Sequence, residues 1–205
     1  MQRSNQTSLK LPGGIELNLN RVAASAAAAG AALGKQAAEQ NEPVPADAVQ
    51  NIADAVSAAH STDRRQFREV RVLWVDDNPS NNATLVNAFE NLGIRVFQAS
   101  STDEAKRILS KDTYDVIISD MSRPPDSEAG KTLLKYLREQ NITTPVIIYA
   151  RWARQHRGEE QTLGVAAITN DPSVVYSTVL HAVPNASQLA RNWRSRPAGS
   201  ERPEP

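Results

Sequence analysis

The pattern of apolar positions along the chain changes at residue 70. Beyond it, short continuous apolar runs alternate with segments in which apolar residues recur every three or four positions. A continuous run of this length predicts a buried strand, and the wider spacing predicts an amphipathic helix. The predicted strands cover residues 70–75, 94–97, 116–120, 145–149 and 165–168.

The predicted helices follow the strands, over 85–92, 101–109, 133–137, 159–163 and 173–183. Gly93 is typical of a helix C-terminus, and Ser101 with Glu104 forms a capping-box pattern. Strands that alternate with helices predict parallel βαβ units with right-handed crossovers. Because the strands are almost wholly apolar, both faces of the sheet are expected to be covered. The predicted fold class is therefore α/β, a doubly wound five-stranded parallel sheet over residues 70–183.

The residues before this sheet have a different composition. Residues 1–12 are mostly polar and are expected to be disordered. Residues 13–62 are expected to form a short strand followed by a mainly helical extension. The strand is predicted by the alternation of apolar and polar residues over 15–20. Ten of the nineteen residues from Val22 to Gln40 are alanine, a composition that favours a helix.

A second helix is predicted after Pro43 and Pro45, because the apolar residues of 47–59 again have helical spacing. Two interpretations of this helical pair stay open. It could dock a partner or join two copies of the chain in a homodimer, or it could be a loosely packed extension rich in alanine. Residues 184–205 contain several arginines and prolines and are expected to be a flexible tail.

The composition narrows the classes of function. The chain has 23 basic and 23 acidic residues, and this balance argues against a surface built to bind nucleic acid or an anionic membrane. It has no cysteine, which excludes disulfides, thiolate metal sites and thiol nucleophiles. The longest uncharged alanine-rich stretch is too short and too weakly apolar for a spanning helix. We therefore expect a soluble cytoplasmic protein without a membrane partner.

Three acidic residues stand where predicted strands end. Asp76 and Asp77 follow the first strand, and Asp120 ends the third. In an open parallel sheet, ligands bind at the carboxyl edge, so these side chains are expected at the binding edge. Carboxylates gathered together repel one another unless a cation lies among them. A hard divalent cation with oxygen ligands, preferably Mg²⁺, would satisfy such a cluster.

The segments around these acids resemble a known family. They are Leu73–Asn78 after the first strand and Val116–Met121 at the third, supported by Pro145–Ile148 and Asn170–Pro172. With these motifs, roughly Arg71 to Val183 resembles the CheY-like receiver domain of response regulators in two-component signalling.

The resemblance implies a set of roles. Asp120 would be the phosphoacceptor and would receive the phosphoryl group from a histidine kinase or another phosphodonor. Asp76, Asp77 and Asp120 would hold Mg²⁺, together with the backbone carbonyl of Ser122. The chain would act on an unknown downstream protein.

Three positions depart from the pattern of the family. The position of the usual Ser or Thr after the fourth strand is Ala150, and the position of the usual aromatic residue is Ile168. The lysine expected before the proline is Asp171, which reverses the charge. Arg123 and Arg151 flank the predicted pocket and could supply the missing positive charge. Alternatively, both are solvated arginines of loops.

The leading interpretation is a stand-alone, atypical receiver of a phosphorelay, without enzymatic activity, that acts through protein–protein contacts. An alternative is a pseudo-receiver that is never phosphorylated and works as a constitutive, metal-responsive or ligand-responsive docking module. A third is a Mg²⁺-dependent phosphohydrolase. Such enzymes usually place two aspartates one residue apart on one strand, whereas Asp76 and Asp77 are adjacent and Asp120 lies on another strand.

Overall fold

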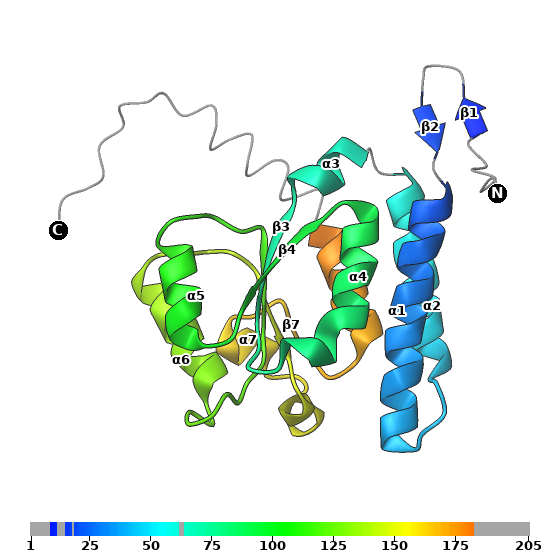
Figure 1. The fold of residues 1–205 in the computed structure, drawn as a ribbon. Coiled ribbons are helices and arrows are strands. Elements are labelled where there is room, and N and C mark those ends of the chain that lie inside the picture. The colour runs from blue at the N-terminus through cyan, green and yellow to red at the C-terminus, as the bar shows by residue number, and fades with distance from the viewer. Residues whose placement is uncertain (1–8, 12–14, 18, 62–63, 183–205) are drawn as a thin grey trace, which may run out of the picture.

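The computed structural model describes residues 9–11, 15–17, 19–61 and 64–182. Its centre is a five-stranded, wholly parallel sheet in the order β4-β3-β5-β6-β7 (Figure 1). The strands are β3 Arg71–Val75, β4 Arg95–Ala99, β5 Val116–Ser119, β6 Val146–Tyr149 and β7 Ala167–Thr169. This confirms the predicted doubly wound sheet, with strand boundaries that shift by one or two residues.

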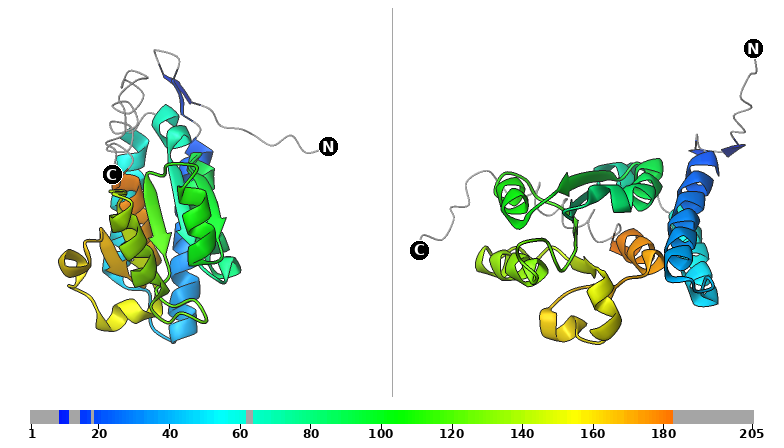
Figure 2. Two further views of the ribbon diagram at one scale, coloured as in Figure 1. Left: turned by 90° about the vertical axis from the view of Figure 1, so that its left-hand side faces the viewer. Right: turned by 60° about the horizontal axis from the view of Figure 1, so that its bottom comes forward.

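Helices cover both faces of the sheet (Figure 2). On one face lie α5 Thr102–Leu109 and α6 Ala129–Glu139. On the other lie α4 Ala83–Leu92 and the helical residues 172–182. The short elements are the 3₁₀-helices η1 Pro79–Asn82 and η2 Arg151–Gln155 and the helix α7 Glu160–Leu163. The sheet is thus buried on both sides, as its nearly continuous apolar strands require.

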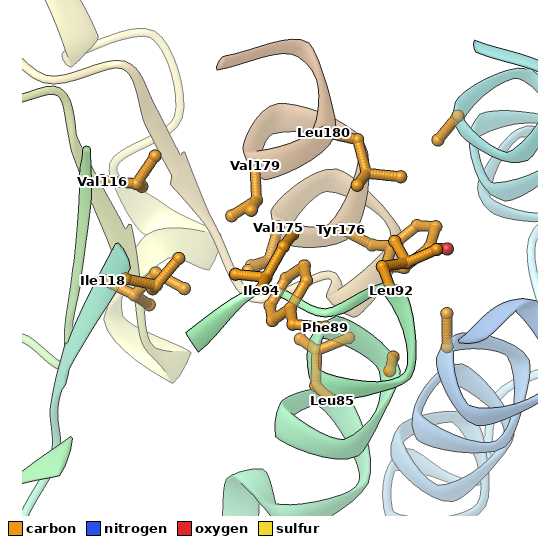
Figure 3. Packing of buried hydrophobic residues seen from close by; sticks show 14 of the residues in the cluster. Leu85, Phe89, Leu92, Ile94, Val116, Ile118, Val175, Tyr176, Val179 and Leu180 are labelled. Carbon is orange, nitrogen blue, oxygen red and sulfur yellow. The ribbon is translucent and has the colours of Figure 1, made fainter. Parts of the chain in front are cut away.

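The core on the second face joins α4 to the last helix. Leu85 and Phe89 point toward Val175 and Tyr176, and the rings of Phe89 and Tyr176 stack with their centroids 5.9 Å apart (Figure 3). All four side chains are buried. Burial of side chains of this size contributes roughly 1.5–3 kcal/mol each, so this layer holds the two helices firmly against the sheet.

The local signals for helix ends are confirmed. Gly93 follows α4 with a φ of 98°, a left-handed conformation that glycine adopts without strain. The side-chain oxygen of Ser101 accepts the backbone N–H of Glu104 at the start of α5. The carboxylate of Glu104 accepts the N–H of Ser100 instead of that of Ser101, so the capping box is displaced by one residue.

The N-terminal residues form a helical region, as predicted, with a hairpin before it. Strands β1 Leu9–Leu11 and β2 Ile15–Leu17 pair antiparallel. The first of these falls in the segment for which the sequence predicted disorder, and α1 Leu19–Gln40 begins before the predicted strand would end. The helices α2 Ala46–Ser61 and α3 Arg64–Glu69 follow. Within the described ranges, no helix is long and apolar enough to cross a membrane.

Helix α1 packs along α4 and the last helix, and α2 lies against its other side (Figures 1 and 2). Buried Ala29 and Leu33 contribute small and medium side chains to this contact. The fully buried hydroxyl of Ser25 donates to the carbonyl of Ala88 at 2.6 Å and shares a hydrogen bond of 2.7 Å with the hydroxyl of Tyr176. The alanine-rich helix is therefore joined to the sheet domain of its own chain by specific polar contacts.

Removing the Ser25 hydroxyl should loosen this contact. We expect Ser25→Ala to lower the free energy of unfolding by about 1–3 kcal/mol, because the Tyr176 hydroxyl would lose its buried partner. Urea denaturation measures the loss. Ser57→Ala is the matched control, since Ser57 is exposed on α2 and donates only to Ala53 one turn earlier. Equal losses in the two variants would contradict the assigned role of Ser25.

Candidate functional site

Two neighbouring strands place the acidic residues at one edge of the sheet. β3 and β5 are paired with Val75 opposite Ser119, so Asp76 and Asp120 leave the sheet side by side. The N–H of Asp120 donates to the carbonyl of Val75 at 2.9 Å, and the N–H of Asp76 donates to that of Ala99 at 2.9 Å. The backbone at both acidic residues is thus fixed by the sheet.

A cleft of about 760 Å³ opens at this edge. Its floor contains Asp76, Asp77, Asp120 and Ser122, the residues that the sequence predicted as a site. One part of its wall is formed by residues 149–152, from the end of β6 into η2, and another part by the last two turns of α1. The structure therefore brings the predicted acidic residues together, and it adds a wall from the N-terminal region.

Asp76 organises the loop that follows β3. Its Oδ1 accepts the N–H of Asn78 at 2.7 Å, and its Oδ2 accepts the side-chain amide of Asn82 at 2.8 Å. Asn82 is buried at the end of η1. Both oxygens of Asp76 therefore hold the loop, although each keeps a further lone pair for a cation.

Asp120 is half-buried, and its electrostatic surroundings are unfavourable for a negative charge. Burial raises the pKa of its carboxyl above the ordinary value, and the nearby charges of Asp76 and Asp77 raise it further. The N–H of Met121, which donates to Oδ1 at 2.8 Å, and the cation of Arg123 act in the opposite direction. The ionised form of Asp120 therefore needs additional positive charge.

Arg123 lies beneath the acidic residues and is only 3% exposed. Its Nη1 donates to the carbonyl of Asp120 at 2.6 Å and to the hydroxyl of Ser119 at 2.9 Å, and its Nη2 donates to the hydroxyl of Thr102 at 2.9 Å. Burial lowers the pKa of Arg123, whereas the charge of Asp120 opposes that shift. The burial excludes the interpretation of Arg123 as a solvated loop residue.

The other flanking cation, Arg151, is exposed and lines the cleft at the start of η2. Ala150 beside it also lines the cleft and has no side-chain donor. Ile168 is buried within β7, where it packs in the core. Position 150 therefore lines the cleft, as expected, but offers no hydroxyl there.

Asp171 is used to begin the last helix. Its Oδ1 accepts the N–H of Ser173 at 2.8 Å, and its own N–H donates to the hydroxyl of Thr169 at 2.9 Å. An aspartate that accepts a hydrogen bond from the N–H two residues later caps the N-terminus of a helix. The carboxylates that raise the pKa of Asp120 are Asp76 and Asp77, and Asp171 is not among the residues that line the acidic cleft. Asp171 therefore caps the last helix and is not a fourth member of the acidic cluster.

The contribution of α1 to the cleft was not predicted from the sequence. Lys35, Gln36 and Glu39 all line the cleft, and the side-chain amide of Gln36 donates to the backbone carbonyl of Asn170. The available signal was a group of polar residues at the C-terminal end of an otherwise alanine-rich helix. That signal predicts a polar helix face but not what the face contacts.

The donor set suits Mg²⁺ bound largely through water. Among the described residues, no three acidic or histidine side chains are arranged to ligate a single ion directly. Mg²⁺ retains several waters and commonly takes only one or two carboxylates from a protein. Asp77, Asp120 and Ser122 line the same cleft and offer oxygen atoms of the kind that this ion prefers.

Comparison with known proteins points to one family. The family model for the response regulator receiver domain matches residues 72–167. The chain is 31% identical over 96 residues to the sensor histidine kinase RcsC of Escherichia coli K12, which is 46% of this chain and 10% of RcsC. It is 30% identical over 103 residues to the sensor protein EvgS of Escherichia coli O157:H7, which is 50% of this chain and 8% of EvgS. The chain thus spans about a tenth of the length of these relatives.

A solved structure agrees with this match. The receiver domain of the Francisella response regulator 1452 is 28% identical to this chain and superposes with a TM-score of 0.50. The superposition covers 57% of this chain and 98% of that domain. The shared part is the sheet domain, so α1 and α2 lie outside the matched region 72–167.

The raised pKa of Asp120 predicts how its removal changes stability with pH. Because the carboxyl loses its proton less readily in the folded state, folding becomes less favourable as pH rises above the ordinary aspartate pKa of about 3.9. We therefore expect Asp120→Asn to raise the free energy of unfolding at pH 7.5, and the gain to vanish near pH 4. Urea denaturation at both pH values measures it. The control is Asp103→Asn at an exposed position on α5. A gain that is independent of pH, or the same gain in the control, would refute the assignment of the effect to the raised pKa of Asp120.

Proposed function

Residues 72–167 are a response regulator receiver domain of two-component systems, and from this premise we propose that the protein is a phosphorelay regulator with Asp120 as its phosphoacceptor. The observation that carries the proposal is the pairing of β3 with β5, which sets Asp76 and Asp120 side by side in one open cleft. The phosphodonor is a histidine kinase or another phosphorylated donor. The modified protein then acts by contact with a downstream protein.

The chemistry follows from the position of Asp120. Its carboxylate oxygen attacks the phosphorus, an O–P bond forms, and the P–N bond to the donor histidine breaks, so that the imidazole keeps the electron pair and takes a proton from water. Asp76, Asp77, Asp120 and the backbone carbonyl of Ser122 would hold Mg²⁺, partly through bound water, and the ion would neutralise charge on the phosphoryl oxygens. The sheet fixes the backbone of Asp120, so the attacking oxygen is oriented before the donor arrives.

A phosphoryl group on Asp120 would be surrounded by side chains that differ from those usual in the family. Ala150 offers no hydroxyl, and Asp171 is occupied with the last helix. Arg123 compensates from below, because its guanidinium binds the backbone carbonyl of Asp120 and lies near the carboxylates. Arg151 compensates from the rim, because it lines the cleft and is exposed. Both roles of these arginines belong to the proposal.

The alternative is a pseudo-receiver that acts without phosphorylation. It is favoured by Ala150, because this position offers no side-chain donor for a phosphoryl oxygen. Receiver domains are generally non-enzymatic signalling modules, and we propose the same here. For a homodimer contact through the N-terminal region, α2 offers an exposed apolar side chain, since Val49 is 54% exposed.

Phosphorylation with a small donor tests the proposal. We expect acetyl phosphate and Mg²⁺ to add about 80 Da to the wild-type chain, as one phosphoryl group does, and to add nothing to Asp120→Asn. Intact-mass measurement checks both. Asp112→Asn is the matched control, since Asp112 is exposed and pairs with Arg71 away from the cleft.

The outcome separates the two functions. If Mg²⁺ binds and the wild-type chain gains no mass, the phosphorelay proposal is wrong and the pseudo-receiver stands. If Asp120→Asn is still labelled, the phosphoacceptor has been misassigned.

A further inference from the structure

The last two turns of α1 form a wall of the acidic cleft. Lys35 and Glu39 line it together with Asp76, Asp77 and Asp120. In Figure 1 the C-terminal end of α1 reaches the edge of the sheet at which α4 begins. A residue that precedes the receiver domain by more than thirty positions therefore shares a cavity with its acidic residues.

Several contacts hold α1 in this position. Ser25 binds α4 and Tyr176 near the start of the helix, and Gln36 binds the carbonyl of Asn170 near its end. Leu33 and Ala37, on either side of Lys35, are buried. Lys35 is thus presented to the cleft by a helix that is fixed along most of its length.

The lining of the cleft carries more negative than positive charge, and Lys35 reduces that excess. Four carboxylates line it, those of Asp76, Asp77, Asp120 and Glu39. Among the described lining residues the cations are Lys35 and Arg151. Arg123 lies below the backbone of Asp120 and is not part of the cleft surface.

The loop after β7 supplies no cation to replace them. Asp171 in that loop caps the last helix, and the carbonyl of Asn170 is bound by Gln36 of α1. This loop carries no cation of its own, and Asn170 in it is bound by Gln36 of α1 and by Arg157. The contact of Gln36 brings Lys35 to the same side of the cleft.

We propose that Lys35 of the N-terminal helix is the anion-binding residue of the site and pairs with the phosphoryl oxygens on Asp120. The contact with the phosphoryl oxygens rests on the proposed function, because it requires that Asp120 is phosphorylated. Before phosphorylation the Lys35 ammonium partly balances the acidic residues, and it then competes with Mg²⁺. Its Nζ lies 3.9 Å from Oε1 of Glu39, and both side chains are about half exposed. Such a surface pair is weak, so the flexible lysine can turn toward an anion.

The opposing effects of Lys35 on cations and anions give a specific test. In the full chain we compare Lys35→Met and Lys35→Arg with Arg21→Met, an exposed cation at the far end of α1. Mg²⁺ alone is titrated and followed by tryptophan fluorescence, since Trp152 lines the cleft. Labelling by acetyl phosphate is followed by intact mass.

We expect Lys35→Met to bind Mg²⁺ about threefold more tightly, because a repelling charge has been removed. We expect the same variant to be labelled by acetyl phosphate about tenfold more slowly, because a charge-assisted contact to the phosphoryl oxygens is lost. Lys35→Arg and Arg21→Met should resemble the wild type in both measurements.

The two measurements distinguish the failure of this inference from failure of the proposed function. If the wild type is never labelled but Lys35→Met still tightens Mg²⁺ binding, the phosphorelay proposal fails while Lys35 remains the cation of the site. If Lys35→Met matches the wild type in both measurements, the inference is wrong. If Lys35→Met weakens Mg²⁺ binding, its effect comes from a less stable α1 and the inference is wrong. If Arg21→Met changes Mg²⁺ binding and labelling as much as Lys35→Met does, the effect is not specific to Lys35 and the inference is again wrong.

Discussion

Repulsion among carboxylates at the ends of two adjacent parallel strands is the constraint on which this site depends. The sheet brings Asp76 and Asp120 together because β3 pairs with β5, and Asp77 follows immediately. Burial and the resulting charge both raise the pKa of Asp120, and the charge must be balanced from outside the cluster. Buried Arg123 provides part of that balance from below. A divalent cation or a further side chain at the open face would provide the rest.

The N-terminal helix α1 contributes to the charge balance of the cleft, because Lys35 lines it. An alanine-rich helix has few large side chains with which to anchor itself, and α1 compensates with buried hydrogen bonds at Ser25 and a contact from Gln36 to the loop after β7. Its small side chains let it approach α4 closely, and its polar end then reaches the acidic cleft. The docking of α1 and the electrostatics of the site are therefore linked. A change that releases the helix would also remove a wall of the cleft.

Most of the sheet domain could be predicted from the sequence, because its signals are local. Continuous apolar runs identify the strands, and the carboxyl ends of parallel strands meet at one edge, which places Asp76, Asp77 and Asp120 together. The role of Asp171 was also within reach, since an aspartate directly before a proline is typical of the start of a helix. The burial of Arg123 and the approach of Lys35 were not, because both depend on packing between segments distant in sequence.

In the proposed site, Asp120 and the end of α1 bind one anion together. A crystal structure of the full chain with Mg²⁺ and beryllofluoride tests it most directly, because beryllofluoride bound to an aspartate imitates a phosphoryl group. We expect the adduct on Asp120, with the ammonium of Lys35 turned away from Glu39 and within hydrogen-bonding distance of a fluoride. An adduct on another residue, or an adduct on Asp120 with Lys35 still paired to Glu39, would contradict it.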